Sequence, residues 1–218
     1  MTGIVLDTIF GPMRLRLRGP DVSSFQGVPR WRIVKQSHDF AICKATEGLT
    51  YVDPDFDYNW KQLKHNGLVR GAYHFARPQP GRSATAEAEH FLSTVARAGG
   101  FRPGDLRPVL DIEWSQGLGF AELQPWVSAF VHHVKAQVGV MPIIYTGSWW
   151  RDHGLVHNYG CPLWLAAYVR FPFLYVPHPW RRWSIWQYTD HAAVGGIVGA
   201  CDFNKVRSRR AFRELRIP

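Results

Sequence analysis

Apolar residues recur at helical spacing in three segments of the chain. The clearest segment runs from Leu123 to Val138, where apolar side chains three or four positions apart form one continuous stripe. A second, Pro54 to Asn66, places its large apolar side chains on one face and is followed by Gly67, a typical residue after a helix end. A third begins after Ser83, a favourable N-cap, and ends at Gly99-Gly100. These patterns predict three amphipathic helices.

Short apolar runs lie between and after these segments and predict strands. They are Phe40–Ala45, Gly71–Phe75, Pro108–Glu113, Ile143–Thr146, Leu163–Tyr168 and Ser184–Tyr188. Strands that alternate with helices of this length favour βα units and a parallel sheet, which we expect to curl into a barrel. The chain beyond about residue 140 is poorer in helical patterns. No linker, internal repeat or low-complexity tract interrupts the 218 residues, so we expect one domain.

Composition narrows the class of protein without indicating an activity. Hydrophobic residues make up 46% of the chain and charged residues 20%, as is typical of globular domains. No segment approaches the roughly 18 uncharged apolar residues of a membrane span, so we expect no membrane insertion. The three cysteines, Cys43, Cys161 and Cys201, form no CxxC pair, and we expect them to be reduced and buried.

The net charge of +9 suggests an anionic partner, which a basic protein attracts whatever its fold. The densest basic run lies at the C-terminus and comprises Lys205, Arg207, Arg209, Arg210, Arg213 and Arg216. Nucleic acid, an anionic membrane and an anionic cell wall are all compatible with this charge, and a solvated helix face explains the run equally well. No nucleic-acid motif accompanies it, so we expect no nucleic-acid partner.

The segment Met1 to Arg18 does not have the pattern of a signal peptide. Its apolar part, Ile4 to Phe10, is interrupted by Asp7, and its arginines follow that part instead of preceding it. We therefore expect synthesis in the cytoplasm, with release or export by another route if the protein acts outside the cell.

Asp111 and Glu113 are the first candidates for chemistry, because acidic residues are scarce and these two are close together. They lie two positions apart in a predicted strand whose other residues are apolar, so both carboxylates project to the same side. An isolated Asp-x-Glu is more often structural, capping a helix or meeting an arginine. Here the pair closes a strand just before Trp114, at the end where parallel barrels carry their active sites. Two buried like charges push their pKa values apart, which suits glycoside hydrolysis.

Aromatic and polar residues recur at the ends of the neighbouring predicted strands. They are Tyr73, His74, Phe75, Tyr145, Trp164, Tyr168, Trp186, Gln187 and Tyr188, with Asp21 and Asp202 near the first and last strands. Each aromatic residue alone is more typical of a core, but together they favour a groove for the flat apolar faces of sugar rings. His74 is the histidine that we place nearest to a site. The sequence contains no GxSxG, HExxH or Walker A motif and no clustered Cys/His ligands, so we expect neither metal nor cofactor.

Taken together, these residues resemble glycoside hydrolase family 25, the muramidase-type lysozymes. The resemblance rests on Gly19–Gly27, Lys44–Gly48, Gly71–Phe75, Leu110–Glu113, Tyr145–Gly147, Leu163–Tyr168, Trp186–Tyr188 and Asp202–Asn204, in the family's order. Each piece is weak alone, whereas the set is highly specific. The match leaves residues 1–18 as an N-terminal extension and residues 19–218 as a single catalytic domain.

The resemblance implies an α/β fold, a flattened, irregular β/α barrel with fewer than eight helices. It implies hydrolysis, without metal or cofactor, of the β-1,4 bond between N-acetylmuramic acid and N-acetylglucosamine. Glu113 matches the acid/base of a retaining mechanism, and Asp111 either attacks the sugar or orients the substrate's 2-acetamido group. Asp21 and Asp202 match the family's other active-site acids. The candidate sugar contacts are Tyr73, Phe75, Tyr145, Trp164, Tyr168 and Gln187.

Three alternatives remain open from the sequence. The first is a non-catalytic protein that binds cell-wall glycan on the same fold, although two adjacent carboxylates serve a pure binder poorly. The second is a chitinase-like activity. The third, a nucleic-acid binder, rests on charge alone. The partner that we expect is bacterial peptidoglycan, bound by a monomer, and the basic character together with the lack of a signal peptide is typical of a phage endolysin.

Overall fold

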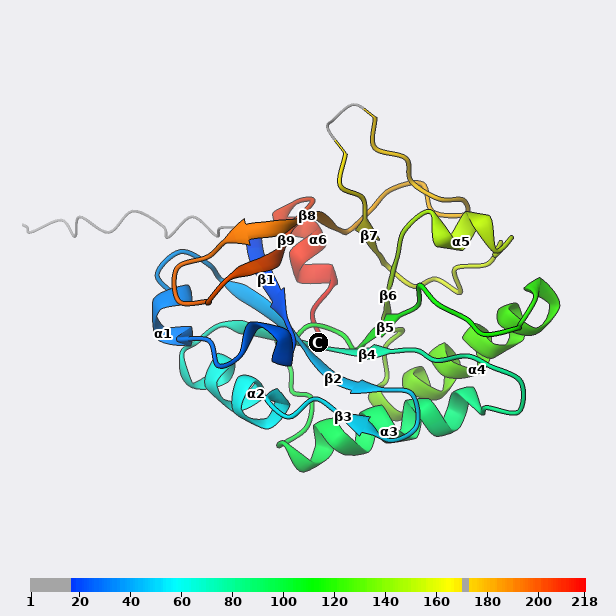
Figure 1. Cartoon of the computed structure of the whole chain (residues 1–218), viewed down its shortest axis with the longest axis horizontal. Coiled ribbons are helices and arrows are strands. Elements are labelled where there is room, and N and C mark those ends of the chain that lie inside the picture. The colour runs from blue at the N-terminus through cyan, green and yellow to red at the C-terminus, as the bar shows by residue number, and fades with distance from the viewer. Residues whose placement is uncertain (1–16, 170–172) are drawn as a thin grey trace, which may run out of the picture.

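Eight strands close into a barrel in the computed structural model, which describes residues 17–169 and 173–218 (Figure 1). The strands are β1 (Arg18–Val22), β2 (Phe40–Glu47), β4 (Val69–Phe75), β5 (Val109–Asp111), β6 (Ile143–Thr146), β7 (Leu163–Ala166), β8 (Ile185–Ala193) and β9 (Ala200–Val206). Their order is β1-β9-β8-β7-β6-β5-β4-β2, and pairing of β1 with β2 closes the ring. The short β3 (Tyr51–Val52) adds to the end of β2 as a hairpin.

The described residues form six α-helices, unevenly distributed around this barrel. They are α1 (Trp31–Val34), α2 (Phe56–His65), α3 (Ala84–Arg97), α4 (Phe120–Val138), α5 (Trp149–Asp152) and α6 (Arg209–Glu214). The three long helices, α2, α3 and α4, lie together along one side, whereas no helix separates β8 from β9 (Figure 1). The predicted irregular barrel with fewer than eight helices is confirmed.

The three predicted helices are present close to their expected ends. The hydroxyl of Ser83 accepts a hydrogen bond from the Ala86 amide at 3.2 Å, and so caps α3 as expected. The stripe that begins at Leu123 faces the core along α4, and Phe56, Trp60 and Leu63 are buried on α2. Helical spacing therefore identified the surfaces that pack on the sheet.

Two strand predictions need correction. The sheet is not parallel throughout, because β9 runs antiparallel to both β8 and β1. A short connection that contains Gly196 and Gly199 at positive φ reverses the chain after β8, and such a hairpin requires an antiparallel partner. In addition, β5 ends at Asp111, so Glu113 lies just beyond the strand in which we predicted it.

Apolar side chains fill two regions on either side of the strands. One core lies between the sheet and the helices. The other fills the barrel itself and is closed by α6 and the residue after it, where Phe212 and Leu215 pack with Phe40, Val109 and Ile143. Those three residues begin β2, β5 and β6, so the apolar filling occupies the amino ends of the parallel strands. The carboxyl ends are left for polar side chains.

The three cysteines are unpaired and buried, as predicted. The proposed extension falls largely on residues 1–16, which lie outside the described residues, and Arg18 is already the first residue of β1. No helix among the described residues is long and apolar enough to cross a membrane.

Candidate active site

The inward side of each strand changes from apolar to polar along the barrel. On β5 the inward residues are Val109 and then Asp111, and on β8 they are Ile185 and then Gln187. Because strand side chains alternate, residues two apart share a face. On β2 the inward residue Ile42 is likewise apolar, and Lys44, two positions later, is polar and lines the pocket. The inward residues of the strands thus form a polar pocket that lies directly above the apolar core of the barrel.

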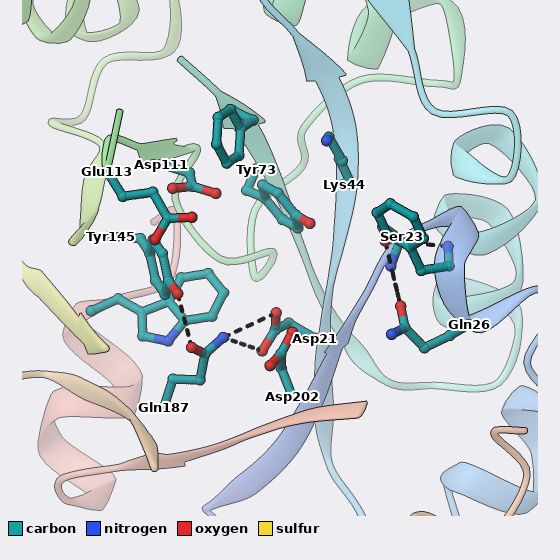
Figure 2. Close-up of a pocket in the computed structure, with 13 residues that line it drawn as sticks. Asp21, Ser23, Gln26, Lys44, Tyr73, Asp111, Glu113, Tyr145, Gln187 and Asp202 are labelled. Atoms are coloured by element: carbon teal, nitrogen blue, oxygen red, sulfur yellow. Dashed lines mark hydrogen bonds between the residues drawn. The ribbon is translucent and has the colours of Figure 1, made fainter. Parts of the chain in front are cut away.

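This pocket is a cavity of about 220 Å³ at the carboxyl ends of the parallel strands (Figure 2). It is lined by Asp21, Ser23, Phe25, Gln26, Lys44, Tyr73, Phe75, Asp111, Glu113, Tyr145, Trp164, Gln187 and Asp202. Of the residues predicted as catalytic acids or sugar contacts, all except Tyr168 line it. The Tyr168 hydroxyl donates a hydrogen bond to Gln187 Oε1 at 2.7 Å, so this residue supports the wall from outside.

Asp111 and Glu113 both reach the pocket but differ in environment. Asp111 is buried, and its Oδ1 has no hydrogen-bond partner among the described residues. Burial and the neighbouring Glu113 raise the pKa of Asp111 well above its ordinary value. The Glu113 side chain is exposed at the mouth of the pocket, as its position beyond β5 allows. Partial burial and the negative charge of Asp202 raise the pKa of Glu113, while the positive charges of Arg77 and Lys44 lower it.

Asp21 lies at the centre of a hydrogen-bond network that crosses the barrel (Figure 2). Gln187 Nε2 donates to Asp21 at 3.1 Å, and Asn204 Nδ2 donates at 2.7 Å. Gln187 Oε1 in turn accepts the Tyr145 hydroxyl at 2.8 Å, and Asn204 Oδ1 accepts the Trp164 indole N–H at 2.7 Å. These bonds fix the orientation of the Tyr145 and Trp164 rings relative to the Asp21 carboxyl group.

Burial and the charge of Asp202 raise the pKa of Asp21 to about 8, although the Asn204 and Gln187 hydrogen bonds lower it. Burial and the nearby Asp190 raise the pKa of Asp202 itself to about 6. All four acids predicted for the site therefore have raised pKa values, because each is at least partly buried and lies near another acid. Raised carboxyl pKa values in one cleft are typical of a catalytic centre.

Sequence reasoning missed four residues that line the pocket and one that supports it. Ser23, Phe25 and Gln26 belong to a 3-10 turn, Ser24–Gln26, and its cap. The Ser23 amide donates to Gln26 Oε1 at 2.9 Å, a capping box that the Ser-x-x-Gln spacing indicates. Lys44 and the supporting Asn204 are detectable by continuing the strand alternation, because Lys44 shares a face with Ile42, and Asn204 shares a face with Asp202.

Two residues expected at the site face away from it. His74 is buried between the sheet and the helices, with Nε2 2.9 Å from Glu87 Oε2 and its ring stacked on Phe130. Its placement near the site was wrong, because the neighbours of Tyr73 and Phe75 on β4 must point outward. Trp186 faces outward for the same reason and donates to the Ala167 carbonyl at 2.7 Å. Among the described residues, no group of three or more His, Cys, Asp or Glu side chains is arranged to hold a metal ion.

Comparisons with known proteins agree with this geometry. The sequence profile of the family described as "Glycosyl hydrolases family 25" matches residues 20–197. Lysozyme M1 of Streptomyces globisporus is 36% identical over 211 residues, which cover 89% of this chain and 69% of that protein. N,O-diacetylmuramidase of a Chalaropsis species is 33% identical over 202 residues, which cover 83% of this chain and 91% of that protein.

The fold comparison gives the same answer. The crystal structure of the bacterial lysozyme from Streptomyces coelicolor has a TM-score of 0.81 at 34% sequence identity, covering 91% of this chain and 96% of that one. The family match runs from within β1 to just beyond β8, and so includes the strand ends that carry Asp21, Asp111 and Gln187. The chain therefore belongs to glycosyl hydrolase family 25 and is a glycoside hydrolase.

Proposed function

We propose that this chain is a muramidase that hydrolyses the β-1,4 bond between N-acetylmuramic acid and N-acetylglucosamine in bacterial peptidoglycan. The proposal rests mainly on Asp111 and Glu113, whose side chains line the same pocket but differ in burial and in hydrogen bonding. Glycoside hydrolysis requires a proton donor and a second carboxyl group at the scissile bond. The names lysozyme and N,O-diacetylmuramidase, borne by two relatives, support this choice of bond.

Glu113 is the acid/base in this proposal. Its exposed position at the pocket mouth allows contact with the glycosidic oxygen, and its raised pKa keeps it protonated closer to neutral pH. It donates that proton to the leaving oxygen as the bond to the anomeric carbon breaks. It then takes a proton from the water that attacks the same carbon.

Asp111 supports assistance by the substrate better than direct attack. Burial disfavours its charged form. Its Oδ1, which has no hydrogen-bond partner within the described part of the chain, is available to accept the N–H of a 2-acetamido group. The acetamido carbonyl oxygen then bonds to the anomeric carbon as the leaving group departs. Water opens the resulting ring, so the configuration at this carbon is retained.

The remaining predicted residues shape the pocket around these two. Asp21 and Asp202 line another part of the pocket, and Gln187 connects Asp21 to Tyr145 through hydrogen bonds. Tyr73, Phe75 and Trp164 supply apolar surface for sugar faces.

Mass spectrometry of reduced digestion products tests the bond directly. Purified peptidoglycan digested by the chain and treated with borohydride should give muropeptides that end in N-acetylmuramitol. Products that end in reduced N-acetylglucosamine would contradict the proposal, and faster cleavage of chitin oligosaccharides would favour a chitinase-like activity. Sedimentation of the protein with walls whose turbidity does not fall would indicate a glycan binder without activity.

A further inference from the structure

Two cations joined by one carboxylate lie at one side of the pocket, and neither takes part in the proposed hydrolysis. Lys44 Nζ lies 2.5 Å from Glu47 Oε2, and Arg77 Nη2 lies 2.6 Å from Glu47 Oε1. Arg77 Nε also donates to Glu47 Oε1 at 2.8 Å. Burial alone would raise the pKa of Glu47, but the hydrogen bonds from Lys44 and Arg77 outweigh it and lower that pKa. Glu47 therefore stays ionised and ties the two cations together.

Aromatic rings hold the same two cations in place. The Arg77 guanidinium lies over both Phe75, at 4.6 Å, and Trp114, at 4.7 Å. The Lys44 ammonium lies 5.1 Å from the Phe75 ring centre and 5.3 Å from that of Tyr51. Cations stacked on rings and bonded to a carboxylate lose little further freedom when they bind a ligand. The arrangement is preorganised.

Both cations keep hydrogen-bond donors beyond those that Glu47 takes. An ammonium has three N–H donors and a guanidinium has five. Within the described residues, one Lys44 donor and two Arg77 donors are used by Glu47. The group of Lys44, Glu47 and Arg77 carries a net positive charge beside a pocket whose other charged residues are all acids. Free cationic donors at this place favour an acidic or carbonyl group of the substrate.

The two cations lie at different depths. Lys44 lines the pocket with Asp111 and Glu113, and its side chain is 11% exposed. Arg77 lies behind Phe75, beside Trp114, outside the pocket lining, and its side chain is 31% exposed. A sugar bound at the catalytic pair would thus meet Lys44 directly, whereas only a longer substituent would reach Arg77.

We propose that Lys44 and Arg77, held by Glu47, form a binding site for the acidic substituent of muramic acid. Lys44 donates to the lactyl carbonyl next to the sugar, and Arg77 takes a carboxylate of the stem peptide through its planar pair of N–H groups. This inference rests on the proposed function, and it supplies a physical basis for preferring muramic acid over chitin, which has neither group.

Arg77→Gln tests the inference on two substrates, one with and one without the stem peptide. Intact glycan strands carry it on the lactyl group through an amide, and strands treated with an amidase keep the lactyl group as a free carboxylate. We expect KM to increase about tenfold on the intact strands, with kcat little changed, because a charge-assisted pair is lost. On the amidase-treated strands we expect little change. Because Arg77 also lowers the pKa of Glu113, each variant is compared at its own pH optimum.

Lys44→Gln should increase KM on both substrates, since both keep the lactyl group. Arg77→Lys should recover part of the loss, and Arg97→Gln, on the exposed face of α3, is the matched control that should behave as wild type. Equal effects of Arg77→Gln on both substrates, or no effect on either, would overturn the inference. If the wild-type protein releases no muropeptides from either substrate, the proposed function fails instead.

Discussion

Asp21 and Asp111 are both buried carboxyl groups in one pocket, but their partners differ. Asp21 accepts hydrogen bonds from Gln187 and Asn204, whereas Asp111 Oδ1 has no partner among the described residues. A carboxyl group with its bonds satisfied by the fold serves to hold other residues, and one left open is available to substrate. The supporting role proposed for Asp21 and the reacting role proposed for Asp111 follow from this difference in their neighbours.

Asp21 should also make stability depend on pH. Its pKa is raised from 3.8 to about 8, so the folded chain keeps a proton that the unfolded chain releases. The contribution of Asp21 to the free energy of unfolding is therefore complete below about pH 4 and falls as pH rises toward about 8, by at most about 1.4 kcal/mol per pH unit.

Denaturant unfolding of Asp21→Asn across this range measures the effect. The variant should lose less stability than wild type as pH rises, and Asp57→Asn, on the exposed surface of α2, should keep the wild-type slope. Parallel curves for Asp21→Asn and wild type would contradict the assigned pKa.

At the scale of elements, the barrel closes where β1 packs very tightly against β2. A Cβ atom added at Gly19 would lie 2.2 Å from the Phe40 carbonyl oxygen, a distance that the strand backbones can relieve only by separating. The Gly19 carbonyl also accepts a hydrogen bond from Asn204 on β9 at 3.1 Å. Gly19 therefore allows β1 to bond both neighbours and to present Asp21 to the pocket.

Gly19→Ala should destabilise the fold by about 2 kcal/mol or more, because overpacking forces backbone shifts. Chemical denaturation of this variant beside Gly195→Ala provides the comparison, since a Cβ at Gly195 meets only Ile33, at 3.8 Å. Equal stability of the two variants would show that β1 does not require this close approach.

The sequence was informative where a strand or helix had one apolar face. The α4 stripe and the buried run that contains Asp111 were predicted for this reason. No strand range was assigned around Asp202, because β9 turns Asp202 and Asn204 toward a polar pocket, and Val206 alone of these alternate residues is apolar and buried in the barrel. The tethering of Lys44 to Arg77 through Glu47 depends on the pairing of β2 with β4, which a linear pattern does not contain.

Across the whole molecule, the two ends of the barrel differ in charge. Four acids and Lys44 line the pocket, whereas α6, which closes the opposite end, carries the exposed Arg209, Arg210 and Arg213. Within α6, Glu214 accepts a 2.7 Å hydrogen bond from Arg210. Only Arg209, Arg210 and Arg213 of the basic run form a solvated helix face, because Lys205 lies on β9 over the Trp186 ring and Arg216 donates to the Gly104 carbonyl. The exposed arginines of α6 can also attract an anionic wall.

Lysis of whole walls should therefore slow as ionic strength rises, because salt shortens the range of this attraction from about 30 Å at 0.01 M to about 10 Å at 0.1 M. Turbidity measurements over this range test the expectation. A double variant, Arg209→Gln with Arg213→Gln, should show a weaker salt dependence. A wild-type rate that does not change with salt would contradict a role for the surface charge.

In the proposed reaction, Glu113 donates the proton that releases the leaving sugar. The most direct measurement is the rate at which Glu113→Gln releases reducing ends from purified peptidoglycan, with circular dichroism to show that the variant is folded. We predict a loss of at least about a hundredfold, because a general acid contributes a factor of about 10² to 10⁴. A folded Glu113→Gln protein that releases reducing ends at nearly the wild-type rate would contradict the account.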